Sequence, residues 1–223
     1  MDKYIHSEVK INYCHLILKI WLTIRSEGDI IIDRKEVTVI KNSTRTRDMI
    51  LTALFTALIT AGAYIRIPVP VCPFTLQFLF TTLAGVLLGS RKGAAAVGIY
   101  VILGLAGLPI FTSGGGIGYV FQPTFGYLLG FIVGAFVTGV ITHSGPVTFR
   151  RLLTACFAGL FTVYAMGMLY YWLISRFWLG QPIGLWSLFL YCFLLAVPGD
   201  ICLCILSAVL GKRLLPVFKN LST

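Results

Sequence analysis

The stretch from Thr112 to Gly139 reads TSGGGIGYVFQPTFGYLLGFIVGAFVTG, and its character changes halfway along. The first half, up to Gln122, is an uncharged loop rich in glycine. The second half has the composition of an apolar helix. Glycine recurs in that helix at every fourth position, at Gly126, Gly130 and Gly134. This spacing lets another helix backbone approach closely within a bilayer, so the stretch predicts packed membrane helices.

The loop half of this stretch is a candidate ligand contact. A glycine-rich loop that leads into a helix can present backbone N–H groups to a polar ligand, and Gly115 and Gly116 lie at its centre. We interpret the loop as the lid, and the following helix as one wall, of a small-molecule site. A flexible connector followed by ordinary helix packing explains the stretch equally well.

Composition indicates a membrane protein. Of its 223 residues, 57% are hydrophobic and only 12% are charged, and the mean hydropathy is +0.89. These values are typical of a polytopic membrane protein and leave little room for a separate soluble catalytic domain.

Six apolar segments predict an all-α protein with six transmembrane helices. They cover residues 49–65, 74–89, 93–110, 123–142, 152–174 and 185–215. The second is short, and the sixth carries Pro198 and Gly199 in mid-span, where we expect a kink or a break. The predicted organisation is a cytoplasmic or membrane-surface segment (1–47), a membrane domain (48–215) and a C-terminal tail (216–223). Within the first of these, Ile30–Ile40 has a β-like composition.

Basic residues in the loops predict the orientation. Two cations, Arg66 and Arg176, lie on one side. Ten lie on the other: Lys41, Arg45, Arg47, Arg91, Lys92, Arg150, Arg151, Lys212, Arg213 and Lys219. Cytoplasmic loops are enriched in Lys and Arg, so we expect both termini in the cytoplasm. The glycine-rich loop and the Arg66–Pro73 connection then face outward. The cations do not cluster with aromatic residues, so no nucleic-acid partner is expected.

Asp200 is the only acidic residue after Asp48 and lies within an apolar run. A carboxylate at membrane depth is costly and usually functional. It can accept two N–H groups side by side, which favours a ligand contact. The alternatives are a structural ion pair with Arg66 or Arg176, and a proton relay.

Further candidate ligand contacts are the amide of Gln77 and a set of aromatic side chains: Phe74, Tyr119, Phe121, Tyr127, Tyr164, Tyr170, Tyr171 and Trp172. Most residues of this kind belong to the interfacial belt or the core, so we expect only a few of them to touch a ligand. We select Gln77, Tyr119, Tyr127 and Tyr164 as the candidates.

The sequence offers no recognisable set of catalytic residues. The histidines are His6, His15 and His143, and none is placed to form a Ser-His-Asp arrangement with Asp200. There is no second membrane acid for an aspartyl pair, no metal-ligand spacing and no Walker A motif. We therefore expect no enzyme activity, no metal and no cofactor.

A second ladder of small residues, Ala53, Ala57 and Ala61, lies on the first apolar segment. Its flat face could dock a helix of this chain or of a partner, and internal packing is the more common explanation.

Five motifs together resemble one known family. They are PFTLQ (Pro73–Gln77), LAGVLLGSRKGAAAVGIYVILGLAGLPIF (Leu83–Phe111), the glycine run Gly114–Gly116, PTFGYLLGF (Pro123–Phe131) and PGD (Pro198–Asp200). In this order and spacing they resemble BioY, the biotin-specific substrate-binding component of energy-coupling-factor transporters.

The resemblance implies capture of biotin from outside. It also implies energy from two cytoplasmic ATPase subunits through a membrane coupling subunit, which the first-helix ladder would face. It implies ligand contacts at Ser113–Gly116, at Pro123–Tyr127, which includes Thr124, and at Asp200.

This chain departs from the family pattern in three places. Many members have Gly where it has Gln122 and Phe125, and Lys where it has Leu203. The resemblance therefore assigns no residue to the ligand's carboxylate. The competing hypothesis is a stand-alone proton-coupled carrier that uses Asp200 as its relay.

Overall fold

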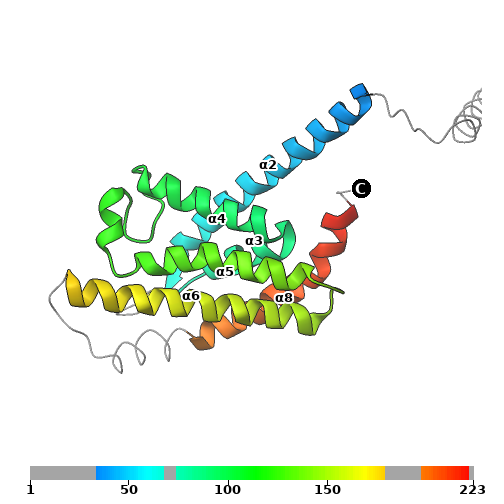
Figure 1. The fold of residues 1–223 in the computed structure, drawn as a ribbon. Helices are drawn as coiled ribbons and strands as arrows, with labels where there is room; N and C mark the ends of the chain where they lie inside the picture. Colours follow the sequence, from blue (N-terminus) through cyan, green and yellow to red (C-terminus); the bar gives the residue numbers. More distant parts are fainter. Residues whose placement is uncertain (1–33, 68–73, 179–196, 221–223) are drawn as a thin grey trace, which may run out of the picture. The chain divides into compact units, whose positions relative to one another are not determined.

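Helices make up most of the protein (Figure 1). The computed structural model describes residues 34–67, 74–178 and 197–220. The elements are α2 (Arg34–Tyr64), β1 (Arg66–Ile67), β2 (Phe74–Thr75), α3 (Gln77–Leu88), α4 (Ser90–Leu105), the 3-10 helix η1 (Ile117–Phe121), α5 (Phe125–His143), α6 (Phe149–Phe177) and α8 (Val197–Asn220). The chain divides into two units, Met1–Arg45 and Thr46–Thr223, and the helical bundle belongs to the second.

Each predicted apolar segment overlaps one of these α-helices, and the all-α prediction is confirmed. One boundary differs from expectation. Helix α2 already begins at Arg34, so the β-like reading of Ile30–Ile40 is wrong from that residue on. The described part of α8 begins at Val197, beside the Pro198–Gly199 pair where a kink or a break is expected. Residues 185–196 of this segment lie outside the described residues, so that expectation stays a prediction.

Helix α3 is short, as the sequence suggested. It has 12 residues, or roughly 18 Å at about 1.5 Å per residue, against a hydrocarbon core of about 30 Å. Before it, β1 pairs with β2 in antiparallel register, with Arg66 opposite Thr75 and Ile67 opposite Phe74. Residues 68–73 of the expected proline-rich connection lie outside the described residues.

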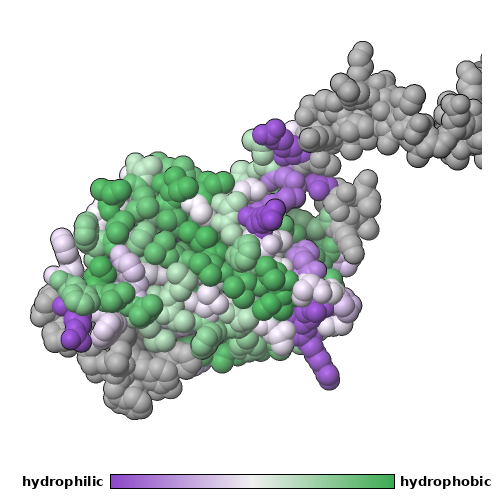
Figure 2. All heavy atoms as spheres, in the orientation of Figure 1, coloured by the Kyte–Doolittle hydropathy of each residue, from purple (hydrophilic) through white to green (hydrophobic). Residues whose placement is uncertain are grey.

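Three of the described helices, α5, α6 and residues Val197–Phe218 of α8, are long and apolar enough to cross a membrane. Large apolar side chains also point outward, among them Phe161 (75% exposed) and Ile102 (66% exposed). Figure 2 shows apolar residues spread over the face formed by the central helices. An apolar surface of this extent would be a liability in water, and it is the expected surface of a helical membrane fold.

The glycine ladder of α5 faces α6, the helix against which α5 packs most extensively. A Cβ atom added at Gly130 would lie 2.9 Å from the Val163 carbonyl oxygen, and one at Gly134 would lie 3.1 Å from that of Gly159. Only glycine leaves room for such a close approach. The contact is tied further by Thr138, whose hydroxyl donates a 3.3 Å hydrogen bond to the Ala155 carbonyl of α6.

Helix α2 buries one face and exposes the other. Phe55, Ile59 and Ala63 are buried, and Thr56 donates a 3.0 Å hydrogen bond to the Ala96 carbonyl of α4. The ladder of Ala53, Ala57 and Ala61 lies on the exposed face. Internal packing therefore does not account for these three alanines.

Candidate ligand site

Asp200 and Tyr164 meet between α8 and α6. Asp200 lies in the first turn of α8, where the positive end of the helix dipole favours a carboxylate. The Tyr164 hydroxyl donates a 2.5 Å hydrogen bond to Asp200 Oδ2. Both side chains are buried. This bond orients one carboxylate oxygen, and a carboxylate has capacity to accept further N–H groups.

One expected alternative for Asp200, an ion pair with Arg176, is not seen among the described side chains. The ion pairs among the described residues join Asp48 to Arg47 and to Lys92. Arg176 is exposed and lies over the ring of Trp172 on its own helix, 5.4 Å from the centroid. The Arg66 side chain lies outside the described part of the chain.

Tyr127 extends the Asp200–Tyr164 pair onto a third helix. It lies in the first turn of α5, and its ring meets that of Tyr164 edge-on, at 6.0 Å and 87°. Beneath the Tyr127 ring lies Gly167 of α6, where an added Cβ atom would be 2.4 Å from a ring carbon. Gly167 thus sets the position of Tyr127. Sequence reasoning missed it, although its spacing of eight residues from Gly159 is a small-residue signal.

The glycine-rich loop is held by its own backbone. Phe111 and Gly114 exchange hydrogen bonds of 2.9 and 3.2 Å, and the Gly116 N–H donates to the Gly104 carbonyl at 2.7 Å. Gly116 has φ +101°, a conformation that glycine adopts at little cost. A Cβ atom at Gly115 would lie 2.1 Å from the Leu108 carbonyl oxygen. The Gly116 N–H is therefore already used within the chain, in contrast to the bare donor we expected.

Tyr119 and Thr124 connect this loop to α5. Tyr119 is buried in η1. Its hydroxyl is 3.2 Å from the Thr112 hydroxyl and accepts a 3.5 Å hydrogen bond from Thr124. The Thr124 carbonyl in turn accepts from the Tyr127 N–H at 3.1 Å. The contacts thus run from the loop to Tyr127, whose ring contacts Tyr164.

Gln77 lies at the far end of an aromatic row. It begins α3, is 2% exposed and lies beside Tyr100, whose hydroxyl donates a 3.1 Å hydrogen bond to the Ile110 carbonyl. The Tyr100 ring meets Phe111 edge-on at 5.4 Å, and Phe111 lies 4.5 Å from the ring of Tyr119. Tyr100 and Phe111 were not predicted, because an aromatic residue within an apolar run carries no local signal of a site.

The structure therefore arranges the predicted residues in two connected groups. One consists of Asp200, Tyr164 and Tyr127, and the other of Gln77, Tyr119 and Thr124 with the glycine loop. Three helices contribute to these groups from their first turn: α3 through Gln77, α5 through Tyr127 and α8 through Asp200. First turns offer N–H groups and a positive dipole end, which suit an anionic or strongly polar ligand.

The fold defines a multi-pass helical protein of the cell membrane. A family model described as the BioY family matches residues 35–220, which is most of the chain. This chain belongs to the BioY family.

Known relatives are similar to this chain in sequence over most of their length. A Lysinibacillus sphaericus protein named "Probable biotin transporter BioY" is 43% identical over 176 residues, which cover 78% of this chain and 90% of that protein. A Rhizobium etli protein named "Biotin transporter BioY" is 37% identical over 186 residues, covering 76% and 94%. These relatives are named as transporters, and the chain is not an enzyme.

One solved structure has the same fold. It is described as the S-component for biotin from an ECF-type ABC transporter, and it superposes with a TM-score of 0.67 at 29% sequence identity. The superposition covers 78% of this chain and 93% of the solved chain.

Proposed function

We propose that this chain is a membrane substrate-binding subunit that captures biotin from outside the cell and delivers it for ATP-driven uptake. The names of the relatives and of the superposed structure support this proposal. The observation that carries it is the buried carboxylate of Asp200, which Tyr164 orients at the junction of three helices.

The chemistry of biotin matches this arrangement. The ureido ring of biotin presents two N–H donors side by side, and one carboxylate can accept both. Hydrogen bonds to an ionised partner are roughly twice as strong as neutral ones. The rings of Tyr127 and Tyr119 supply apolar walls with polar tips, which suit a compact bicyclic ligand.

Energy coupling is the second part of the proposal. The sequence has no Walker A motif, so ATP hydrolysis is assigned to two cytoplasmic ATPase subunits linked through a membrane coupling subunit. The exposed face of Ala53, Ala57 and Ala61 supports a docking surface on α2, since small residues let a partner helix approach closely.

The decisive experiment is equilibrium binding of biotin to the purified full-length chain and to Asp200→Asn. The substitution keeps the shape of the side chain but places a donor where a ligand N–H points. Loss of a buried charged partner costs on the order of 2–5 kcal/mol, or roughly 30-fold to several-thousand-fold in affinity.

The matched control is Asp48→Asn on α2, which makes the same chemical change away from Asp200. This variant should bind biotin normally. Near-normal affinity in a folded Asp200→Asn protein would refute the placement of the ligand. A proton-coupled carrier would instead keep substrate binding in Asp200→Asn and lose the response of transport to a pH gradient.

A further inference from the structure

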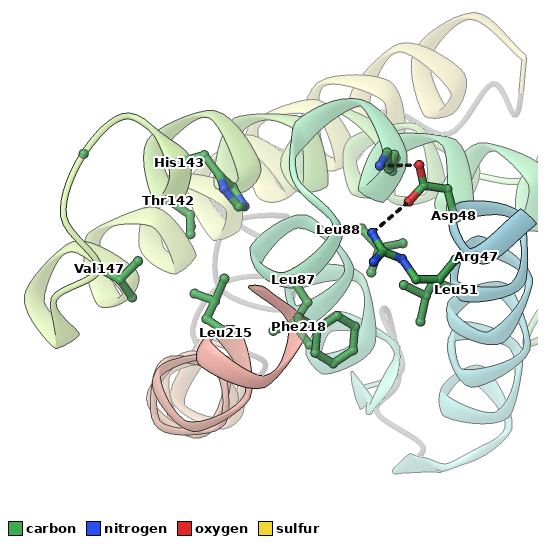
Figure 3. Close-up of a pocket in the computed structure, with 12 residues that line it drawn as sticks. Arg47, Asp48, Leu51, Leu87, Leu88, Thr142, His143, Val147, Leu215 and Phe218 are labelled. Carbon is green, nitrogen blue, oxygen red and sulfur yellow. Dashed lines mark ion pairs between the residues drawn. The ribbon is translucent and has the colours of Figure 1, made fainter. Parts of the chain in front are cut away.

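A hollow lies at the other end of α8 from Asp200. It is a cavity of about 340 Å³, within the size range of small-ligand sites. Helices α2, α3, α4, α5 and α8 and the turn after α5 contribute to it (Figure 3). Its lining residues are Arg47, Asp48, Leu51, Leu87, Leu88, Lys92, Thr142, His143, Gly145, Val147, Leu215 and Phe218.

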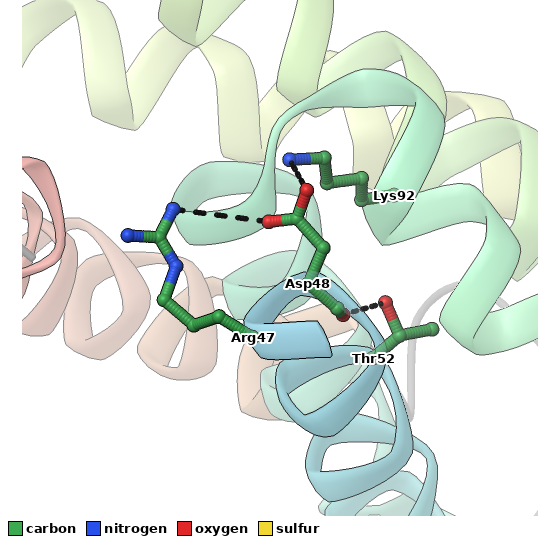
Figure 4. A network of polar contacts seen from close by, with 4 residues as sticks. All are labelled: Arg47, Asp48, Thr52 and Lys92. Carbon is green, nitrogen blue, oxygen red and sulfur yellow. Dashed lines mark hydrogen bonds and ion pairs between the residues drawn. The ribbon is translucent and has the colours of Figure 1, made fainter. Parts of the chain in front are cut away.

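One side of this cavity carries net positive charge. Asp48 lies between two cations, 2.6 Å from Lys92 Nζ and 3.8 Å from Arg47 Nη2 (Figure 4). One carboxylate therefore faces two permanent cations, with His143 on the lining as well. The side chains of Lys92 and Arg47 are 49% and 31% exposed, so a ligand at the protein surface can reach them.

The remaining wall is apolar and contains one polar atom without a partner. Leu87, Leu215 and Phe218 line this part. Thr142 lines it too and is 1% exposed. Its hydroxyl oxygen has no hydrogen-bond partner among the described residues. A buried hydroxyl of this kind is costly unless a ligand satisfies it.

We propose that this cavity binds a phosphate group carried by an anionic phospholipid of the adjacent leaflet. The ends of α3, α5 and α8 and the start of α4 meet here, which is the level of the lipid headgroups. The lining is cationic on one side and apolar on the other, as a phospholipid requires. Met49 and Ile50, beside the site on α2, point outward with 66% and 63% exposed, so acyl chains adjoin it. This site is independent of the proposed biotin site.

The test uses the full chain purified in a neutral detergent. Binding of phosphatidylglycerol and of zwitterionic phosphatidylcholine is measured by native mass spectrometry, with inorganic phosphate as a competitor in a parallel titration. We expect a preference for phosphatidylglycerol. The double variant Arg47→Gln/Lys92→Gln should weaken that binding at least roughly 30-fold, since each direct hydrogen bond between a cationic side chain and the phosphate is worth about tenfold or more.

The matched control is Lys212→Gln/Arg213→Gln. It removes two exposed cations near the end of α8 that do not line the cavity. It should lose only general surface attraction, a fewfold effect that salt screens. Both double variants should keep normal biotin binding, which checks that they fold.

A second pair of variants makes the test independent of charge. Thr142→Val keeps the volume and removes the unpartnered hydroxyl, and it should weaken phosphatidylglycerol binding several-fold. Thr154→Val removes an exposed hydroxyl bonded to its own helix and should have no effect.

Each outcome decides the proposal. In one outcome, inorganic phosphate itself binds and displaces phosphatidylglycerol, and the same variants that weaken lipid binding weaken its binding. That result supports a phosphate site but makes the free anion its occupant. Equal loss of phosphatidylglycerol in both double variants overturns the proposal in favour of general surface charge. Absence of any lipid or phosphate preference, with loss of partner-subunit association only in the cavity variants, overturns it in favour of a protein-docking site.

Discussion

The contact between Tyr164 and Asp200 is the residue-level feature on which the proposed ligand site depends. A carboxylate has two oxygens that rotate together, so a bond to Oδ2 also fixes where the other oxygen points. Tyr164 is therefore a positioning residue in this proposal, and its hydroxyl need not touch the ligand to affect affinity.

We expect Tyr164→Phe to weaken biotin binding roughly 10- to 100-fold. A hydrogen bond to a charged group contributes about 1.5–3 kcal/mol, and each 1.4 kcal/mol is about tenfold in affinity. Isothermal titration of the purified chain measures this directly. The comparison is Tyr170→Phe on the same helix, which loses a bond to the Val120 carbonyl and should mainly lower stability. Equal affinity losses in the two variants would contradict a specific role for Tyr164.

Some site residues could be predicted from sequence, and others could not. Asp200 was conspicuous because a lone acid in an apolar run has no cheap structural explanation. Its partner could not be chosen among the tyrosines, because the Tyr164 contact depends on how α6 packs beside α8. Tyr100, Phe111 and Gly167 resemble any other core residue until the helices are packed.

At the level of elements, α5 and α6 form the rigid part of the site. The sequence could predict that α5 packs closely against some other helix, because glycine at every fourth position is typical of close helix contacts in membranes. The partner helix was not predictable from the ladder alone. Hydropathy runs unbroken across Pro198, so the sequence alone could not decide between a kink and a helix start at this position.

Gly167→Ala should disturb the site through this contact. An added Cβ would lie 2.4 Å from the Tyr127 ring, and overpacking typically costs about 1–3 kcal/mol. We expect a lower melting temperature together with weaker biotin binding. Gly98→Ala on α4 is the control, because an added Cβ there meets nothing within 4 Å. It should be neutral or slightly stabilising, by up to about 1 kcal/mol. An unchanged affinity in Gly167→Ala would show that Tyr127 does not contribute to the ligand site.

The alanine face of α2 permits a separate test of energy coupling. Ala57→Trp places a bulky group on an exposed face, so biotin binding by the purified chain should stay normal. ATP-dependent uptake by the assembled complex should be abolished, because the small face could no longer accept a helix. Ile102→Trp, at another exposed position on α4, should leave uptake intact. If Ala57→Trp lost binding as well, the substitution would be acting on the fold and not on docking.

For the molecule as a whole, orientation in the membrane follows from the loop charges. The positive-inside rule places the loop around Gly118 outside and the turn after α5 inside. Gly118 has open space around it, and Ser144 in that turn is exposed, so both positions accept a cysteine.

A membrane-impermeant thiol reagent added to intact cells should label Gly118→Cys, with the parent chain as the background. Ser144→Cys should be labelled only after permeabilisation. The reverse pattern would invert the predicted topology and, with it, the direction from which ligand enters.

The hydrogen bonds within the glycine-rich loop bear on how long a captured molecule stays. The bond from Gly116 to Gly104 and the exchange between Phe111 and Gly114 order the loop without a ligand, so its conformational entropy is lost during folding and not on capture. Such preorganisation lowers the cost of binding and would favour a long residence time for a ligand held under the loop. The same property opposes delivery, since release then requires work on the loop. Under the proposed function, tight capture and rapid turnover would therefore conflict, and the ATP-driven partner subunits would supply the work that release requires.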